Sequence, residues 1–546
     1  MSIIIFHVRI LLSIKVLQES TKVLSNKKKH NHSFLIQNSI TTMWSILLAI
    51  ILLFYFTYRL LKYWIIDPKQ IHTDLASQGI PGRYIPIVGE ILHIRRAAQA
   101  GDPLGHLRAL NEQYGSYYRS SFGPISRLSI SDPLLIQGVL KTNARFYHKS
   151  NLMRMILGTL LGNRNLLITE DQIHSQHRRL IAPVFQHQNI NSMISLMIEI
   201  TSSYINKWKS ISENKKENEY HVDIHEEMTR LTLDIVTGCV FGSGLMSNDN
   251  AREVIYRNVT TTLSDVEKRI HNMIAIIPIV NRLPLPSKQR IDRSKRDVRI
   301  VIQRIIDERK KGLSKSSCKG PDLLDLILAA RNNDEDGKLT QFSDEDIYEE
   351  ALTFVLAGHE TTSNLMVWTL FNLSNNPDVC QRLEHEIDSV LNDNEDLSIS
   401  TLSLLTYTED VLKESLRLHQ PVPTIVRKAI EDNTLTASDG KQIHIKKDTD
   451  ILIDLYSLHH SERYWSEPWK FDPSRFTGRH FDTHLPFSAG PRSCIGQNFA
   501  MLEAKVMLAM MIKHFRFELV PGQKHTPEIV ITMRPKYGMW MKVSSR

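Results

Sequence analysis

Cysteine is scarce in this chain, since only four of its 546 residues are cysteines: Cys239, Cys318, Cys380 and Cys494. They lie far apart and form no paired motif, which argues against a disulfide framework or a zinc site and favours a reducing compartment. The chain also lacks an arginine-rich arm interleaved with aromatic residues, so nucleic acid is not expected as a partner. Its net charge of +8 instead suggests acidic partners or an anionic membrane surface. A hydrophobic content of 42% with 23% charged residues predicts a folded protein with a sizeable core.

A long apolar run lies near the N-terminus, from residue 44 to residue 66. It carries no charge from Trp44 to Tyr58, and the basic residues Arg59 and Lys62 follow among aromatic and aliphatic residues. A helix needs about 20 mostly apolar residues to cross a bilayer, with basic and aromatic residues at the interface. A signal peptide is the main alternative, but no small-residue cleavage site follows. We therefore expect residues 43–66 to form an uncleaved transmembrane anchor that contacts membrane lipid.

The N-terminal extension, residues 1–42, complicates the orientation of this anchor. Arg59 and Lys62 favour a cytosolic location for the C-terminal side, whereas Lys27, Lys28 and Lys29 favour the opposite. One hypothesis is that Met43 is the working start of the protein. A mitochondrial presequence is the alternative, which the apolar span directly behind it disfavours. We expect a single-pass protein of the endoplasmic reticulum membrane with a cytosolic catalytic domain.

A proline-containing segment follows the anchor. Residues 67–90 contain the stretch Ile-Pro-Gly-Arg-Tyr-Ile-Pro-Ile-Val-Gly at positions 80–89, which predicts a stiff hinge because proline fixes φ and blocks helix. Residues 91–546 then form the expected catalytic domain. Within it, residues 117–130 predict a hairpin and 531–542 a last hairpin, while the charged stretch 309–322 predicts a solvated connection.

The segment Phe487 to Gly496 reads Phe-Ser-Ala-Gly-Pro-Arg-Ser-Cys-Ile-Gly and leads directly into a helical run. Cys494 stands beside Arg492 at the mouth of that helix, where backbone N–H groups and the positive helix end favour a thiolate. Gly490 allows a turn, Gly496 allows close approach of a flat partner, and Phe487 can screen the sulfur from water. The set predicts a thiolate presented to a metal, and a sole cysteine ligand is the arrangement that favours O–O cleavage on heme iron. A buried structural cysteine is the alternative.

A second motif, Ala-Gly-His-Glu-Thr-Thr, occupies residues 357–362 of a helix expected from Ser343 to Asn372. Thr361 can donate to the carbonyl of Ala357 and so open a polar notch for water. Glu360 beside it completes an acid–alcohol pair suited to passing protons. The alternative is a kinked buried helix in which the acid forms a salt bridge.

The segment Glu414-Ser415-Leu416-Arg417 places an acid and a base three residues apart on one helix face. With the motifs around Cys494 and Glu360 it resembles, in kind and order, the motifs of the cytochrome P-450 family of heme-thiolate monooxygenases. The resemblance extends from about Ile80 to Lys542. It implies a mainly α fold with a small β region, after one N-terminal transmembrane helix. It also implies heme b as the cofactor, with Cys494 as the axial ligand of its iron.

The resemblance also assigns several basic residues. Arg178 and Arg427 are expected at the heme propionates, with His174 in the position where the family usually has tryptophan. Phe487, Arg492 and Gly496 complete the cofactor-binding loop. Arg475 is expected to join Glu414 and Arg417 in a buried structural cluster.

The reaction implied by the resemblance inserts one atom of O2 into a lipophilic substrate such as a fatty acid, a sterol or a foreign compound. Electrons are expected from NADPH through a flavoprotein reductase, with cytochrome b5 as a further donor. Glu360 and Thr361 would pass protons, and Arg178, Arg179 and Lys505 could form a basic docking face for the reductase. The substrate itself is not predicted, because residues 145–160 and 240–285 carry no motif.

Two alternative functions remain open. Some relatives run isomerase or dehydratase chemistry on peroxides without a reductase, and they typically lack the acid–alcohol pair that is present here. The second alternative is a non-catalytic heme-binding protein.

Overall fold

The computed structural model describes residues 31–214, 220–242, 249–270, 285–318, 320–332, 342–391, 397–529 and 531–546. The chain divides into two compact units, one ending at Asp67 and the other running from Pro68 to Arg546. Residues 1–30 of the expected extension and much of the motif-free stretch 240–285 lie outside the described residues.

The N-terminal unit is helical. Helix α2 covers Asn31–Leu61, and a π-helical turn η1, Lys62–Ile66, leads into α3, Asp67–Ser77. Among the described residues one helical stretch, Thr41–Ser77, is long and apolar enough to cross a membrane, with a mean hydropathy of 1.9. Two of its hydroxyl groups are satisfied within the helix, since Ser45 and Thr57 each donate to the carbonyl four residues back. The predicted anchor, residues 43–66, lies within this stretch.

The β region of the second unit contains a five-stranded sheet in the order β1-β2-β8-β5-β3. Strands β1, Tyr117–Phe122, and β2, Ile125–Ile130, form the predicted hairpin. Strand β2 then pairs in parallel with β8, Asp450–Asp454, and β8 pairs antiparallel with β5, Thr424–Ala429. The edge strand β3, Tyr147–Lys149, joins β5. The sheet thus assembles segments that are far apart in the sequence.

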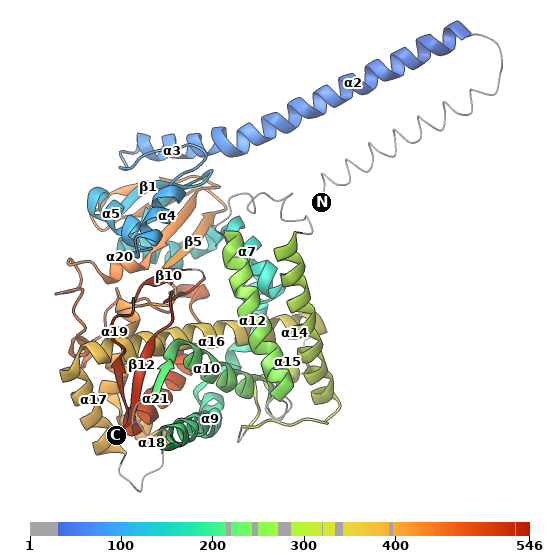
Figure 1. Cartoon of the computed structure of the whole chain (residues 1–546). Helices are drawn as coiled ribbons and strands as arrows, with labels where there is room; N and C mark the ends of the chain where they lie inside the picture. Colours follow the sequence, from blue (N-terminus) through green and yellow to red (C-terminus); the bar gives the residue numbers. More distant parts are fainter. Residues whose placement is uncertain are drawn as a thin grey trace. The chain divides into compact units, whose positions relative to one another are not determined.

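The helical region is built around α16, Asp344–Asn375. It begins with a capping box in which Ser343 and Asp346 satisfy each other's backbone N–H groups, as the sequence indicates. Nearly all sides of α16 are buried, which is typical of a helix that crosses the middle of a domain. Figure 1 shows it among α10, Ile224–Phe241, α9, His187–Asn214, and α21, Gln497–His514. At the other end of this unit β1 and β5 gather with α4, Ile91–Gln99, α5, Gly105–Tyr114, and α20, Leu455–His459.

The other helices are α4 Ile91–Gln99, α5 Gly105–Tyr114, α6 Pro133–Gln137, η2 Gly138–Thr142, η3 Ala144–Phe146, α7 Asn151–Leu161, α8 Asp171–Ile181, η4 Ala182–Phe185, α12 Asp249–Ile270, α14 Pro286–Lys310, α15 Leu323–Asn332, α17 Pro377–Val390, α18 Ile399–Leu404, α19 Thr406–Leu418, α20 Leu455–His459, η6 Pro473–Phe476 and η7 Gly490–Arg492. The other strands are β4 Tyr220–Asp223, β6 Asn433–Thr436, β7 Gln442–Ile445, β9 Phe515–Leu519, β10 Pro527–Ile529, β11 Met533–Pro535 and β12 Trp540–Ser545.

The prediction that residues 531–542 form a last hairpin is wrong. Strand β11 pairs with β10, whereas β12 pairs with β4 and β9 in a different sheet. The two strands on either side of residues 536–539 therefore do not pair with each other. The partner β4 comes from a distant part of the sequence, which local spacing does not indicate.

The stretch 309–322 is more than a solvated connection. Arg309 is buried and donates to Asp322 at 2.8 Å and to the carbonyl of Phe241 at 2.9 Å. The carboxylate neutralises the buried guanidinium, so this connection is tied to the end of α10.

Candidate functional site

The loop that carries Cys494 is shaped by its glycines and by backbone hydrogen bonds. The N–H of Cys494 donates to the carbonyl of Phe487 at 2.9 Å, and the N–H of Ser493 donates to that of Gly490 at 3.0 Å. Gly490 has φ of 72°, and a Cβ there would overlap the carbonyl oxygen of Leu140. Only glycine fits both constraints, so the loop depends on this residue.

The exposure of Cys494, together with the protein that surrounds its thiol, indicates an interior space at this residue, which we call the hollow. Of the four cysteines, all of which are described, only Cys494 is exposed, and yet burial raises the pKa of its thiol. A side chain that is accessible although protein surrounds it lines an interior space. The backbone N–H of Gly496 and the charge of Arg178 act in the opposite direction on this pKa and favour the thiolate.

Helix α16 also has an accessible position in its buried middle, at Ala357. The hydroxyl of Thr361 donates to the carbonyl of Ala357 at 2.8 Å, which is the notch predicted from the sequence. Gly358 serves a different purpose, because a Cβ there would lie 3.0 Å from Val236 on α10. Glu360 is mostly buried and accepts a hydrogen bond from Thr532.

Three basic side chains from separate elements meet beside the loop. Lys149 on β3 and Arg427 on β5 are register partners and are both buried. In the described part of the chain neither forms an ion pair with a carboxylate. His174 on α8 lies near both, and burial together with the charges of Lys149 and Arg178 lowers its pKa to about 4. Buried cations need a counter-charge, so this group is suited to an anionic ligand.

Lys149 was not among the residues predicted from the sequence. It stands in a short strand without a recognisable motif, and its proximity to Arg427 arises only from the pairing of β3 with β5. Neither the composition nor the residue spacing of the sequence indicates a role for Lys149.

Arg178 and Arg492 have protein partners in this structure. Arg178 donates to the carbonyl of Ser493 at 2.8 Å and to its hydroxyl at 3.2 Å, so it fixes the residue next to Cys494. Arg492 forms an ion pair with Glu170, which also accepts from the backbone N–H of Lys149. Phe487 is half-buried and packs against the main hydrophobic core. A Cβ on Gly496 would meet Phe185 only at an ordinary 3.6 Å, so protein contacts alone do not require a glycine there.

The predicted structural cluster of Glu414, Arg417 and Arg475 is formed. Glu414 and Arg417 are fully buried and form a two-pronged ion pair at 2.7 and 2.8 Å, and Arg475 reaches Glu414 at 3.0 Å. Arg417 also donates to the carbonyls of His459 and Pro468, each within 2.8 Å. The charges and donors of this cluster satisfy one another, which gives it a structural role.

The expected docking face of Arg178, Arg179 and Lys505 is not formed. Lys505 is buried and pairs with Glu409 at 2.8 Å, and Arg178 is occupied by Ser493. Only Arg179 is exposed. Single charges in the sequence did not show that α21, which is buried on nearly all sides, would bury Lys505.

A second group of possible metal ligands lies away from Cys494. Glu90, His93 and His106 place one donor atom each within 4.8 Å of one another. Arg83, however, donates to both oxygens of Glu90 at 3.2 and 2.9 Å and already neutralises it. This cluster is better described as an ion-pair network that holds α4 against α5.

The residues around the hollow fit a heme. A cysteine sulfur suits iron, the accessible surface at Ala357 leaves room for a flat group, and the uncompensated charges of Lys149 and Arg427 match two propionates. Together they define the class of the protein as heme-thiolate.

Comparison with known proteins agrees with this class. The sequence profile of the family "Cytochrome P450" matches residues 80–540. The chain is 32% identical over 526 residues to "Cytochrome P450 709B1" of Arabidopsis thaliana, covering 90% of this chain and 97% of the relative. It is also 32% identical to a "Cytokinin hydroxylase" of Arabidopsis thaliana, with 87% and 93% covered, and to human "Cytochrome P450 4F2", with 80% and 85% covered.

The chain therefore belongs to the cytochrome P450 family and is a cytochrome P450 monooxygenase. The predicted family, the mainly α fold with a small β region, and heme b with a cysteine thiolate as its cofactor are confirmed. O2 and a small molecule are its substrates.

Proposed function

We propose that this chain is a membrane-anchored monooxygenase that hydroxylates a lipophilic substrate with electrons from NADPH, delivered by a flavoprotein reductase. The observation that carries the proposal is the accessible sulfur of Cys494 in the protein interior. When heme is bound there, its iron activates O2. The apolar N-terminal helix supports a substrate that partitions into lipid, such as a fatty acid, a sterol or a foreign compound.

Cys494 is proposed as the iron ligand. Arg178 and the N–H of Gly496 stabilise its negative charge, and Phe487 limits access of water to the sulfur. Arg492 stabilises the same loop through its ion pair with Glu170.

The heme propionates are proposed to lie against Lys149 and Arg427, with His174 as a neutral hydrogen-bond donor. This assignment revises the expectation for Arg178, whose donors are directed to Ser493. The carboxylates would neutralise two buried charges that otherwise repel each other.

Glu360 and Thr361 on α16 are proposed to deliver protons. The Thr361 hydroxyl donates to the Ala357 carbonyl, so it can still accept a hydrogen bond from a water in the notch. A carboxyl group near such a water exchanges protons with it.

For the organisation of the chain we propose an anchor at residues 43–66 after an extension at 1–42, a hinge at 67–90 and the catalytic domain at 91–546. We propose the endoplasmic reticulum membrane as the location, with the catalytic domain in the cytosol and cytochrome b5 as a further electron donor. The apolar helix and the basic residues at its C-terminal end support this placement.

The deciding experiment is the spectrum of the reduced protein under carbon monoxide. Thiolate ligation gives a red-shifted Soret band, which Cys494→Ser should abolish and the control Cys380→Ser should retain. A histidine-type band in the wild type would overturn the proposal. NADPH consumption with reductase, coupled to product, separates a monooxygenase from an isomerase or dehydratase, which would turn over a hydroperoxide without reductase.

A further inference from the structure

The acid and the alcohol of the proton-delivery pair point in different directions. Glu360 and Thr361 are successive residues of α16, so their side chains leave the helix about 100° apart. Thr361 is bound to Ala357 on its own helix. The carboxylate of Glu360, whose side chain is only 14% exposed, instead meets Thr532 from the C-terminal β segment.

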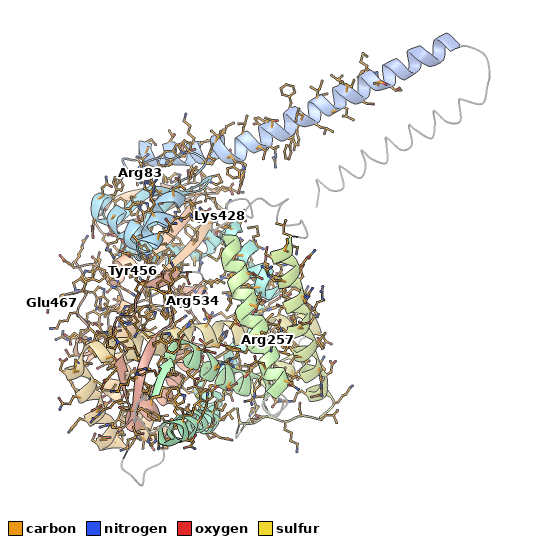
Figure 2. The ribbon with its side chains drawn as sticks, in the orientation of Figure 1. Arg83, Arg257, Lys428, Tyr456, Glu467 and Arg534 are labelled. Atoms are coloured by element: carbon orange, nitrogen blue, oxygen red, sulfur yellow. The ribbon has the colours of Figure 1, made fainter. Side chains whose placement is uncertain are left out.

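Thr532 is fixed in place by the backbone around it. It precedes β11, where the N–H of Met533 donates to the carbonyl of Pro421 at 2.8 Å and the carbonyl of Met533 accepts from the indole of Trp368 at 3.3 Å. Its side chain is 3% exposed. Arg534, labelled in Figure 2, lies two residues further along the same strand. The hydroxyl is therefore held against α16.

The direction of the Thr532 hydrogen bond follows from its neighbours. Asn364 donates to the Thr532 oxygen at 3.1 Å and to the carbonyl of Glu360 at 2.8 Å. The single hydroxyl hydrogen of Thr532 then points at Oε1 of Glu360, 2.8 Å away. Asn364, Thr532 and Glu360 form a closed network that fixes one carboxylate oxygen.

The other oxygen of Glu360 has a different environment. Oε2 lies 3.8 Å from Nε2 of His359, whose Nδ1 is bound to the carbonyl of Val355 at 2.8 Å. Nδ1 must carry the hydrogen, so Nε2 is an acceptor, and within the described residues it has no hydrogen-bond partner. His225 on α10 and Arg534 on β11 are further titratable or charged groups near this position. The surroundings of Oε2 are therefore compatible with both the protonated and the ionised form of the Glu360 carboxyl group.

We propose that Thr532 is a positioning residue for proton delivery, which binds Oε1 of Glu360 so that Oε2 is the atom that carries the proton. The inference rests on the proposed role of Glu360 and Thr361. In the step, the O–H bond at Oε2 breaks and its proton passes to water in the Thr361 notch. Solvent then returns a proton to Oε2, and no electrons move.

Thr532→Val removes the hydroxyl at nearly constant volume, and Thr532→Ser keeps it. The measurement is the share of NADPH electrons recovered as hydrogen peroxide. The assay contains a flavoprotein reductase, and laurate is the probe substrate. This share is informative because failed proton delivery releases reduced oxygen whether or not laurate is oxidised. We expect Thr532→Val to slow NADPH oxidation about tenfold and to raise the peroxide share several-fold. Thr532→Ser should stay within about twofold of wild type on the same geometric grounds.

Thr369→Val is the matched control, because Thr369 is a buried threonine of α16 whose hydroxyl, within the described part of the chain, bonds to the carbonyl of Leu365 alone. It should leave the peroxide share unchanged. Glu360→Gln should resemble Thr532→Val, and the double variant should be no worse than Glu360→Gln. Reduced-carbon-monoxide spectra report folding, and Thr532→Ala replaces Thr532→Val should the latter not bind heme.

Three outcomes separate the failure of this inference from the failure of the proposed function. An impaired Glu360→Gln with a normal Thr532→Val and Thr532→Ala overturns the positioning role alone, as does an additive double variant. A normal Glu360→Gln overturns the role of Glu360 itself.

Discussion

Lys149 and Arg427 lie directly opposite each other in the antiparallel pairing of β3 with β5, and each residue is 8% exposed. Like charges in such positions destabilise a sheet, and burial increases the cost. Burial and the neighbouring arginines lower the pKa of the Lys149 ammonium far below its ordinary value. Among the described residues no carboxylate forms an ion pair with either side chain, and we propose that the heme propionates provide the counter-charge.

Replacing Lys149 with methionine should have opposite effects on the two forms of the protein. The apoprotein should become slightly more stable, because a buried repulsion is removed. The holoprotein should lose heme about tenfold faster, since one charge-assisted hydrogen bond to a propionate is lost. Transfer of heme to apomyoglobin measures the rate, and urea unfolding measures the apoprotein.

Lys428→Met is the matched control for this prediction. Lys428 follows Arg427 on β5, is labelled in Figure 2 and forms an ion pair with Asp448 at 2.9 Å. Successive residues of a strand point to opposite faces, so its loss should not change heme release. Equal effects of both substitutions would contradict the propionate assignment.

Gly490→Ala should prevent stable heme binding. The new Cβ would overlap the carbonyl oxygen of Leu140, and φ of 72° adds strain for any residue other than glycine. Gly440→Ala tests the backbone strain without the overlap, because Gly440 has φ of 83° but a Cβ there would meet nothing within 4 Å. We expect a loss of about 1–2 kcal/mol of stability and full heme content for Gly440→Ala. Heme content after purification is the measurement, and similar heme content in both variants would contradict the overlap.

Local patterns in the sequence predicted local structure well. The helix start at Ser343, the hairpin from Tyr117 to Ile130 and the hydrogen bond from Thr361 to Ala357 all depend on residues within a few positions of one another. Such features follow from backbone geometry alone. The family resemblance added the fold and the cofactor.

The contacts that complete the site were not predictable in this way. Lys149 meets Arg427, and Thr532 meets Glu360, only because strands and helices from distant parts of the chain come together. The errors have the same origin, since Lys505 is basic in the sequence but buried against Glu409 in the fold. Sequence spacing carries no information about which distant segment will cover a charge.

Glu414→Gln should destabilise the protein by about 3 kcal/mol, because it leaves the buried guanidinium of Arg417 and the nearby Arg475 without a carboxylate. Chemical unfolding of the holoprotein measures the loss. Arg304→Ala removes the exposed pair of Arg304 with Glu308 on α14 and should cost less than about 1 kcal/mol. A cost for Glu414→Gln as small as that of the surface variant would show that the cluster is not structurally important.

The pH dependence of stability should carry a contribution from the buried His460. Burial lowers the pKa of His460 to about 3, and its Nδ1 is bound to the carbonyl of Tyr456 at 2.9 Å. The unfolded chain, in which an ordinary histidine titrates near 6.5, binds more protons than the folded chain between these two values. The stability that His460 contributes is therefore complete above about pH 6.5 and declines as the pH falls, by about 1.4 kcal/mol per pH unit.

His460→Gln should be less stable than wild type at pH 7 but should lose less stability between pH 6.5 and 4.5. The control His480→Gln changes a side chain that is 89% exposed and should follow the wild-type curve. Urea unfolding at several pH values tests this, and parallel curves for His460→Gln and wild type would contradict it.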